Sequence, residues 1–298
     1  MIHFPLSGVD TYWWLPALVA FCISSLTSTG GVSGAVLILP FQVSVLGFGG
    51  PAVSPTNLLY NIVAIPSGVY RYYREKRMVW SLTWITIMGT VPGLFVGAII
   101  RIKYLPDPCA FKLFAAGVLA YIGVRLFLDL LRAPQAQPKP AGPEQFHVTP
   151  LETNLKRVGY EFNGTAYYAS TPGLLALSLI VGVVGGIYGI GGGAIIAPFL
   201  VTIFRLPVYT VAGAALFGTF LSSIAGVLIY AVISPLYSSA QVPITPDWLL
   251  GLLFGIGGAC GMYVGARMQR FIPAKVIKAI LSACVLFIAV MYVIEFLR

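Results

Sequence analysis

The chain has 298 residues, of which 58% are hydrophobic and only 9% are charged. Soluble globular domains carry about 25% charged residues, so this composition excludes an ordinary soluble domain, as does the mean hydropathy of +0.90. The formal net charge is +9, and in a membrane protein the positions of these charges along the chain matter more than their sum. Apolar runs recur over nearly the whole length, which indicates a polytopic helical membrane protein.

Ten apolar segments follow one another, five on each side of a polar stretch. Residues 132–168 are rich in Pro, Gln, Glu, Lys and Thr and predict a polar linker. We therefore expect an all-α membrane protein with a first transmembrane repeat over 1–131 and a second over 169–298. The segments are expected near residues 13–28, 34–48, 52–70, 79–100, 109–131, 174–184, 194–204, 208–233, 248–268 and 273–296.

A glycine-rich stretch lies between the sixth and seventh segments, which are each too short for a comfortable membrane crossing. Glycine costs roughly 1 kcal/mol in a helix interior, so the run Gly191, Gly192 and Gly193 favours a break. Irregular backbone inside a membrane is tolerated only where protein or a watery cavity satisfies its polar groups. A short pair of segments interrupted by glycine therefore points to a transport site, whether the pair spans the membrane or re-enters it.

The two halves resemble each other, which indicates an internal duplication. Each half holds five segments, an odd number, so the second copy enters the membrane from the opposite face as an inverted repeat. Offsets of 158 and 168 residues align the first half with the second through Gly31 and Gly189, Gly34 and Gly192, Pro40 and Pro198, Phe41 and Phe199, Gly68 and Gly226, Trp80 and Trp248, Gly89 and Gly257, Gly93 and Gly261, Val96 and Val264, and Gly97 and Gly265.

Basic residues give the orientation, because they mark the cytoplasmic side of a membrane protein. Alternating the segments places fourteen Lys and Arg residues on the linker side and only Arg101, Lys103, Lys112 and Arg298 on the other. We expect a cytoplasmic linker and external termini. Topology and lipid headgroups then explain the basic runs, and no nucleic-acid partner is expected.

The glycine stretches predict an anion site. Each opens a short helix whose first N–H groups lack partners within the helix, and these donors with the helix dipole attract an anion without a formal positive charge. Missing side chains let a ligand approach the backbone. Close helix packing is the alternative interpretation. It is the preferred one for the glycines spaced every four residues, Gly89, Gly93, Gly97, Gly257, Gly261 and Gly265.

Neutral polar residues within the apolar segments complete the candidate site. Asn57 and Asn61 lie one helical turn apart, and Thr219, Ser222 and Ser223 occupy the equivalent stretch of the second half. Their amides and hydroxyls can donate to an oxyanion, or they can link helices, which is the favoured interpretation for the serines. The candidate substrate-binding residues are Gly30, Gly31, Ser33, Gly34, Asn57, Asn61, Gly191, Gly192, Gly193, Thr219 and Ser222.

Several residue patterns are missing from the sequence. No Asp or Glu falls in the middle of a segment and no His falls within one, which disfavours cation carriers and proton pumps. No H-E-x-x-H motif, phosphate-binding loop or Ser-His-Asp set is evident. We therefore expect no enzyme activity, no metal site and no cofactor.

The stretch Tyr188–Leu200, with its weaker copy Gly30–Phe41, resembles the signature of the TauE/SafE sulfite exporter family. The resemblance extends over the two-half layout and the central polar linker. It implies a permease of the bacterial inner membrane for sulfite, thiosulfate or small organosulfonates, commonly assigned to export. The first copy departs from the pattern, with Ser33 in place of Gly191 and Ala35 in place of Gly193.

The combined hypothesis is a secondary transporter of small sulfur oxyanions that works by alternating access. A passive anion channel is one alternative, and a membrane protein that docks cytoplasmic sulfur-metabolism proteins is another. The sequence leaves open the exact substrate, the direction of flux, the coupling ion and the oligomeric state, with a homodimer among the options.

Overall fold

The computed structural model describes residues 1–29, 33–74, 76, 78–131, 148–237, 243–268 and 274–297. All ten predicted apolar segments are helical, and six helices in the described part of the chain are long and apolar enough to cross a membrane. The helices are α1 (Trp14–Thr29), α2 (Ala35–Pro40), η1 (Phe41–Val45), α3 (Val53–Arg74), α4 (Trp80–Lys103), α5 (Pro108–Leu131), α6 (Thr171–Tyr188), α7 (Gly193–Thr202), α8 (Val208–Tyr237), α9 (Trp248–Met268) and α10 (Ala274–Leu297).

The short helices of the two halves are built differently. In the first half, α2 ends at Pro40 and continues as the π-helical turn η1. In the second half, α6 ends in a left-handed cap at Gly189, with φ of 78°, and α7 begins at Gly193. Because the Gly189 N–H donates to the carbonyl of Gly185 at 2.8 Å, the break closes with the cap that glycine favours. The predicted helix break is confirmed.

Glycines bring two pairs of long helices into backbone contact. A Cβ placed on Gly93 of α4 would collide with the carbonyl of Leu179 on α6. A Cβ on Gly261 of α9 would collide in the same way with the carbonyl of Phe21 on α1. The predicted packing role of the four-residue glycine spacing is therefore confirmed in both halves. Since α1 and α4 belong to the first half, each of these two pairs joins one half to the other.

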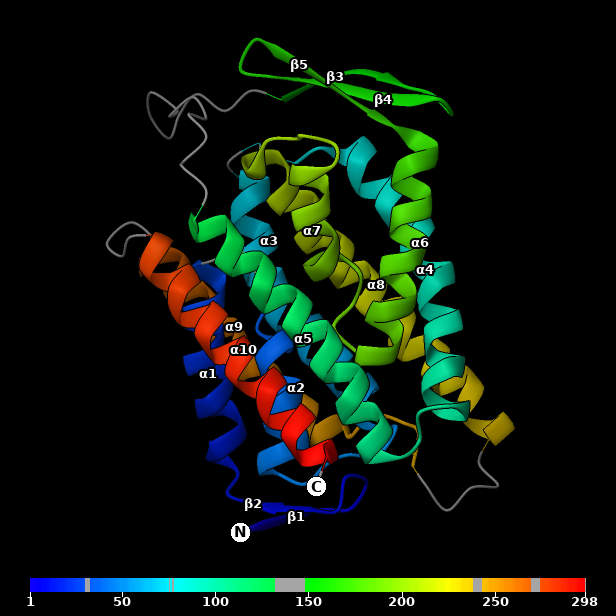
Figure 1. Cartoon of the computed structure of the whole chain (residues 1–298), viewed down its shortest axis with the longest axis vertical. Helices are drawn as coiled ribbons and strands as arrows, with labels where there is room; N and C mark the ends of the chain where they lie inside the picture. Colours follow the sequence, from blue (N-terminus) through cyan, green and yellow to red (C-terminus); the bar gives the residue numbers. More distant parts are fainter. Residues whose placement is uncertain are drawn as a thin grey trace.

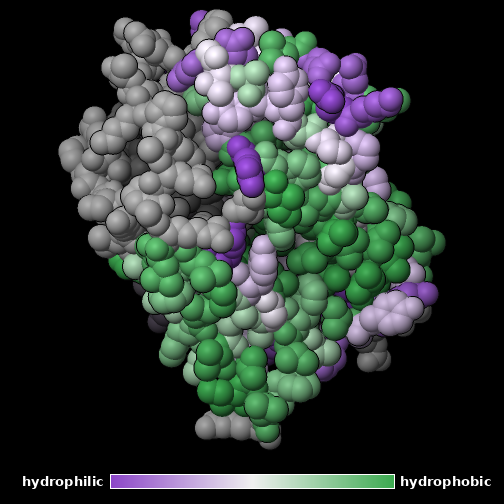
Figure 2. Space-filling model, turned by 45° about the horizontal axis from the view of Figure 1, so that its top comes forward, coloured by the Kyte–Doolittle hydropathy of each residue, from purple (hydrophilic) through white to green (hydrophobic). Residues whose placement is uncertain are grey.

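The two ends of the molecule carry different structures (Figure 1). Both chain termini lie at one end, and a three-stranded sheet lies at the other. The sheet has the order β3 (Val148–Thr153), β4 (Arg157–Phe162) and β5 (Thr165–Ser170), with antiparallel pairing throughout. Between the ends, Figure 2 shows a broad hydrophobic surface over the helices, as expected for contact with lipid.

The sheet occupies much of the segment that the sequence predicts as a polar linker. Within 132–168, the structure describes residues 148–168, and these are mostly β-strand. Asn163 and Gly164 connect β4 to β5, with φ of 49° and 80°, the positive values that a tight hairpin turn requires. The Tyr160 hydroxyl hydrogen bonds with that of Thr210 at 2.8 Å and so fastens the sheet to α8.

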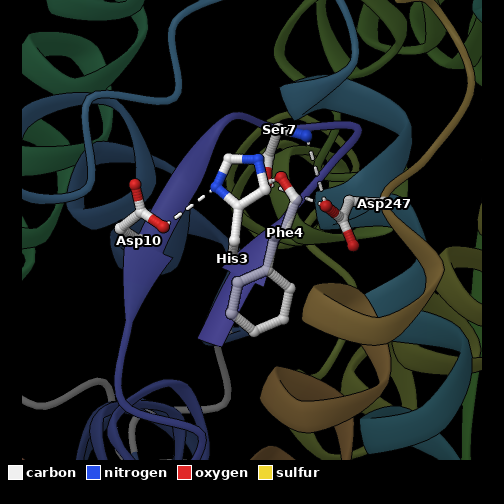
Figure 3. A network of polar contacts seen from close by, with 5 residues as sticks. All are labelled: His3, Phe4, Ser7, Asp10 and Asp247. Atoms are coloured by element: carbon white, nitrogen blue, oxygen red, sulfur yellow. Dashed lines mark hydrogen bonds and ion pairs between the residues drawn. The ribbon is translucent and has the colours of Figure 1, made fainter. Parts of the chain in front are cut away.

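A small hairpin closes the end that carries the termini. It consists of β1 (Ile2–Phe4) and β2 (Val9–Thr11), and His3 pairs with Asp10 across it at 2.9 Å (Figure 3). The Ser7 hydroxyl donates to Asp247 at 2.8 Å, and the same carboxylate caps α9 by accepting from the Leu250 N–H at 3.0 Å. The hairpin is therefore anchored to the first turn of α9.

Candidate functional site

The two glycine breaks meet at α3, where Asn61 contacts both. Its Nδ2 donates to the carbonyl of Ile190 in the second break at 3.0 Å. Its Oδ1 accepts from the hydroxyl of Ser33 in the first break at 2.7 Å. The Ser33 hydroxyl also accepts from the N–H of Ala35, in the first turn of α2, at 3.3 Å. One buried amide therefore holds residues of the two halves together.

Asn57, one turn earlier on α3, repeats this bridge. Its Nδ2 donates to the carbonyl of Ala35 at 3.1 Å and to that of Gly189 at 3.0 Å. Its Oδ1 accepts from the side-chain amide of Gln42 at 3.4 Å. Both predicted asparagines thus lie at the junction of the breaks. Their hydrogen bonds in this conformation are to the protein, as the helix-linking interpretation expects.

Hydroxyl groups of α8 line the other side of the second break. The Ser222 hydroxyl donates to the carbonyl of Thr219 at 3.1 Å and accepts from the Gly192 N–H at 3.4 Å. The Thr219 hydroxyl donates to the carbonyl of Ala215 at 2.8 Å. A Cβ placed on Gly191 would lie 3.1 Å from the Oγ atoms of Ser222 and Ser223.

The Ser223 hydroxyl differs from these neighbours because it is buried and has no hydrogen-bond partner. Most buried polar side-chain atoms are paired, so such a group calls for an explanation. It lies against Gly191, whose φ of 72° requires glycine. Ser223 therefore offers a free donor to a ligand at the break. The sequence hypothesis placed it among the polar residues of the eighth segment but not among the binding residues.

The described candidate residues are closed off from solvent in this conformation. Ser33, Asn57, Asn61, Thr219 and Ser222 are each at most 2% exposed. The glycines are equally tightly packed: Cβ atoms would collide with the Tyr60 hydroxyl at Gly34, the Thr90 methyl at Gly192, and the Ala215 carbonyl at Gly193. Close packing thus applies to these glycines as well. Gly30 and Gly31 lie outside the described residues.

Arg101 places a buried positive charge near the second break. Its side chain is fully buried and forms no ion pair with a described carboxylate. Nη2 donates to the carbonyls of Gly49 at 3.1 Å and Gly50 at 2.9 Å, and Nη1 donates to that of Leu105. The guanidinium also stacks 3.9 Å from the ring centre of Phe111. Carbonyl dipoles therefore replace the counterion that a buried charge ordinarily has.

A short chain of contacts joins Arg101 to the glycine stretch. Its Nε donates to the Ser54 hydroxyl at 3.4 Å, and that hydroxyl donates to the carbonyl of Ile187 at 2.9 Å. A Cβ on Gly189 would collide with the backbone of Ser54. The sequence hypothesis counted Arg101 only as one of the few charges on the external side.

A signal for its burial is present in the sequence. Arg101 continues the four-residue spacing of Gly89, Gly93 and Gly97, so it lies on the same packed face of α4. The described residues contain no cluster of three His, Cys, Asp or Glu side chains that could hold a metal. The chemistry available at the breaks is therefore hydrogen-bond donation from backbone and neutral side chains, with one arginine nearby.

A comparison with protein families identifies the chain. The family model described as Sulfite exporter TauE/SafE matches residues 16–292. The chain belongs to this family. It is accordingly a multi-pass membrane protein of a transporter family and not an enzyme, and the TauE/SafE description implies a sulfite-like anion as its substrate.

Curated relatives of this TauE/SafE protein carry transporter descriptions. The probable membrane transporter protein YunE of Bacillus subtilis is 24% identical over 282 residues, covering 93% of this chain and 95% of YunE. The probable membrane transporter protein MamO of Magnetospirillum gryphiswaldense is 26% identical over 279 residues, covering 88% of this chain but 42% of MamO. A probable membrane transporter protein of Xylella fastidiosa is 24% identical over 264 residues, covering 87% and 84%. No solved structure matches the chain.

Proposed function

We propose that the chain is a secondary transporter that exports small sulfur oxyanions such as sulfite, thiosulfate or C2 sulfonates. The observation that carries this proposal is the meeting of the two glycine breaks at Asn57 and Asn61, beside a buried arginine that forms no ion pair with a described carboxylate. An oxyanion has several acceptor oxygens and needs several convergent donors. Those donors are backbone N–H groups of the breaks, the Ser223 hydroxyl and, once their present partners are released, the asparagine amides.

The Arg101 charge supports an anion over a cation as the transported species. A buried guanidinium attracts anions and repels cations, and the low dielectric of the interior strengthens both effects. The described middle portions of the membrane helices carry no Asp or Glu, the residues that mark cation pathways. In this proposal Arg101 raises the local concentration of the anion on the terminal side of the second break.

Alternating access between inverted repeats is the mechanism that the packing supports. The long-helix pairs α1 with α9 and α4 with α6 use equivalent glycines, as two copies of one unit would. The asparagine bridges of α3 hold the two halves together at the breaks, so breaking and remaking these bonds opens the site on one side at a time. Because the candidate residues are buried, this conformation is a closed one, in which neither end of the molecule gives solvent access to the breaks.

The orientation of the chain in the membrane defines the path of an exported anion. The excess of basic residues on the sheet side supports a cytoplasmic sheet, external termini and a location in the bacterial inner membrane. The anion then enters from the sheet side, pauses at the breaks and leaves past Arg101. The direction of net flux follows from the gradients of the anion and of any coupled ion.

Counterflow in proteoliposomes tests the proposal. Vesicles containing the purified chain and loaded with unlabelled sulfite should accumulate labelled sulfite transiently, and the rate should saturate with concentration. A passive anion channel would conduct current without this overshoot. A docking protein would give no flux above empty vesicles. Absence of counterflow with sulfite, thiosulfate and C2 sulfonates would overturn the proposal.

A further inference from the structure

Two cavities adjoin at the end of the molecule that carries the sheet. The first has a volume of about 470 Å³ and lies between the residues that follow α3, the start of α4 and the strands β3 and β4. Tyr73, Trp80 and Ser81 line it from the membrane helices, and Pro150 and Tyr160 line it from the sheet. Its size falls within the usual range of ligand sites.

The described lining of the first cavity is positively charged. Arg74 and Lys76 both line it, and no acidic residue does so among its described lining residues. Tyr160 also lines this cavity, and its hydroxyl hydrogen bonds with the hydroxyl of Thr210. Burial raises the pKa of Tyr160, so this side chain is neutral at pH 7 and adds no negative charge. The cavity therefore suits an anionic group.

The second cavity is apolar and adjoins the first. It has a volume of about 300 Å³ and shares Tyr73, Met78 and Trp80 with its neighbour. Its remaining lining is wholly apolar or aromatic and comes from α3 and α8, namely Pro66, Val69, Tyr70, Phe217 and Phe220. Trp80 packs edge-on against Phe217 with ring centres 5.5 Å apart. Side by side, the two cavities form one amphiphilic site with a cationic part and an apolar part.

The position of this site matches a membrane surface. Tyr70, Tyr73 and Trp80 are 62%, 63% and 44% exposed at the ends of α3 and α4. Aromatic side chains of this kind gather at the level of lipid headgroups. The apolar cavity is lined mainly by residues of the membrane helices α3 and α8, and the cationic cavity is lined in part by the sheet.

We propose that the two cavities hold one anionic phospholipid, with its phosphate between Arg74 and Lys76 and part of one acyl chain along Phe217 and Phe220. Basic pockets at the cytoplasmic ends of transmembrane helices suit such headgroups. The lipid contacts the membrane helices and the sheet at once, so it stabilises the docking of the sheet. This role is separate from transport and does not depend on the identity of the transported anion.

Native mass spectrometry of the full chain tests this site. Protein stripped of lipid in neutral detergent should retain one phosphatidylglycerol in preference to phosphatidylcholine, and phosphatidylglycerol alone should raise the unfolding temperature. The double variant Arg74→Gln/Lys76→Gln should weaken phosphatidylglycerol binding by roughly thirtyfold. The double variant Lys103→Gln/Lys156→Gln removes the same charge outside the cavities and should bind like the wild type. Val69→Trp, which fills the apolar cavity, should also weaken binding.

Three outcomes would overturn the proposal. Equal retention of phosphatidylglycerol and phosphatidylcholine would show that binding does not depend on the charge of the headgroup. Equal loss in both double variants would show that net charge, and not the cavity, binds the lipid. Displacement of phosphatidylglycerol by an equal concentration of glycerol 3-phosphate would show that the cavity takes a soluble phosphate compound without help from an acyl chain.

Discussion

The hydroxyl of Ser223 is the uncommitted side-chain donor among the described residues at the second break. Because it has no partner in the closed conformation, its removal costs no protein hydrogen bond. We expect Ser223→Ala to fold normally and to raise the KM for sulfite at least about tenfold, the loss of one hydrogen bond to a charged ligand. The measurement is the concentration dependence of counterflow.

Ser178 provides a matched control for this substitution. Its hydroxyl is also buried and unpartnered, but its Cβ lies against Gly89 at the contact of α6 with α4, away from the breaks. Ser178→Ala should leave KM unchanged. Equal KM values in wild type and Ser223→Ala would remove Ser223 from the site.

Arg101 combines a structural and an electrostatic role, and two substitutions separate them. Arg101→Gln removes the charge and unpairs carbonyls, so it should cost on the order of 1–3 kcal/mol in stability and raise KM at least about tenfold. Arg101→Lys also loses the planar fork but keeps the charge. It should be similarly destabilised but recover much of the affinity for the anion.

Lys103→Gln is the control for net charge at the same end of α4, because Lys103 is exposed. It should change neither stability nor KM. If the lysine and glutamine variants of Arg101 lose affinity and stability in parallel, the arginine is a structural clamp alone.

At the residue level, the sequence predicted part of the hydrogen-bonded junction between the glycine breaks. Asn57 and Asn61 could be predicted because neutral amides are conspicuous in an apolar segment. Ser223 could not be separated from Ser222, because which of two adjacent hydroxyls finds a partner depends on the rotation of α8 against the break. Arg101 was missed because its distance from the middle of the segment suggested exposure, whereas its glycine-spaced face buries it.

The glycine faces of α4 and α9 are the element-scale feature with the clearest consequence. Alanine at Gly93 or Gly261 would push against a backbone carbonyl of the partner helix, which can move only with the helix. Overpacking of this kind costs about 1–3 kcal/mol. We expect each substitution to lower the unfolding temperature in detergent.

Gly117 of α5 serves as the control because a Cβ there meets no atom within 4 Å. Alanine is a better helix former than glycine by up to about 1 kcal/mol. Gly117→Ala should therefore be neutral or slightly stabilising. A Gly93→Ala variant as stable as Gly117→Ala would show that the helices are not in backbone contact.

At the element scale, hydropathy and glycine predicted the helices well, because a bilayer allows few other structures. The π-helical turn after Pro40 was not predicted, since it depends on how Phe41–Val45 packs. The sheet was also not predicted, because the polar composition of 132–168 is typical of a linker although Asn163-Gly164 is a hairpin signal. The pairing of the helices could not be predicted, since the spacing of glycines shows that a helix face is packed but not which helix packs against it.

For the whole molecule, the testable feature is which end faces the cytoplasm. With four native cysteines replaced, Tyr104→Cys on the terminal side and Leu155→Cys in the sheet turn report the two ends, because both side chains are highly exposed. An impermeant maleimide should label Tyr104→Cys in intact spheroplasts. It should label Leu155→Cys only after the membrane is opened, and the reverse pattern would contradict the proposed orientation.

In the proposed transport cycle, a sulfur oxyanion rests between the two glycine breaks. Selenite, the heavier analogue of sulfite, allows the anion to be located by anomalous diffraction from crystals of the full chain. We predict a peak within hydrogen-bonding distance of the Ser223 hydroxyl and the N–H groups that begin α7. Transport of selenite by a chain whose anomalous peak lies away from both breaks would contradict this binding site.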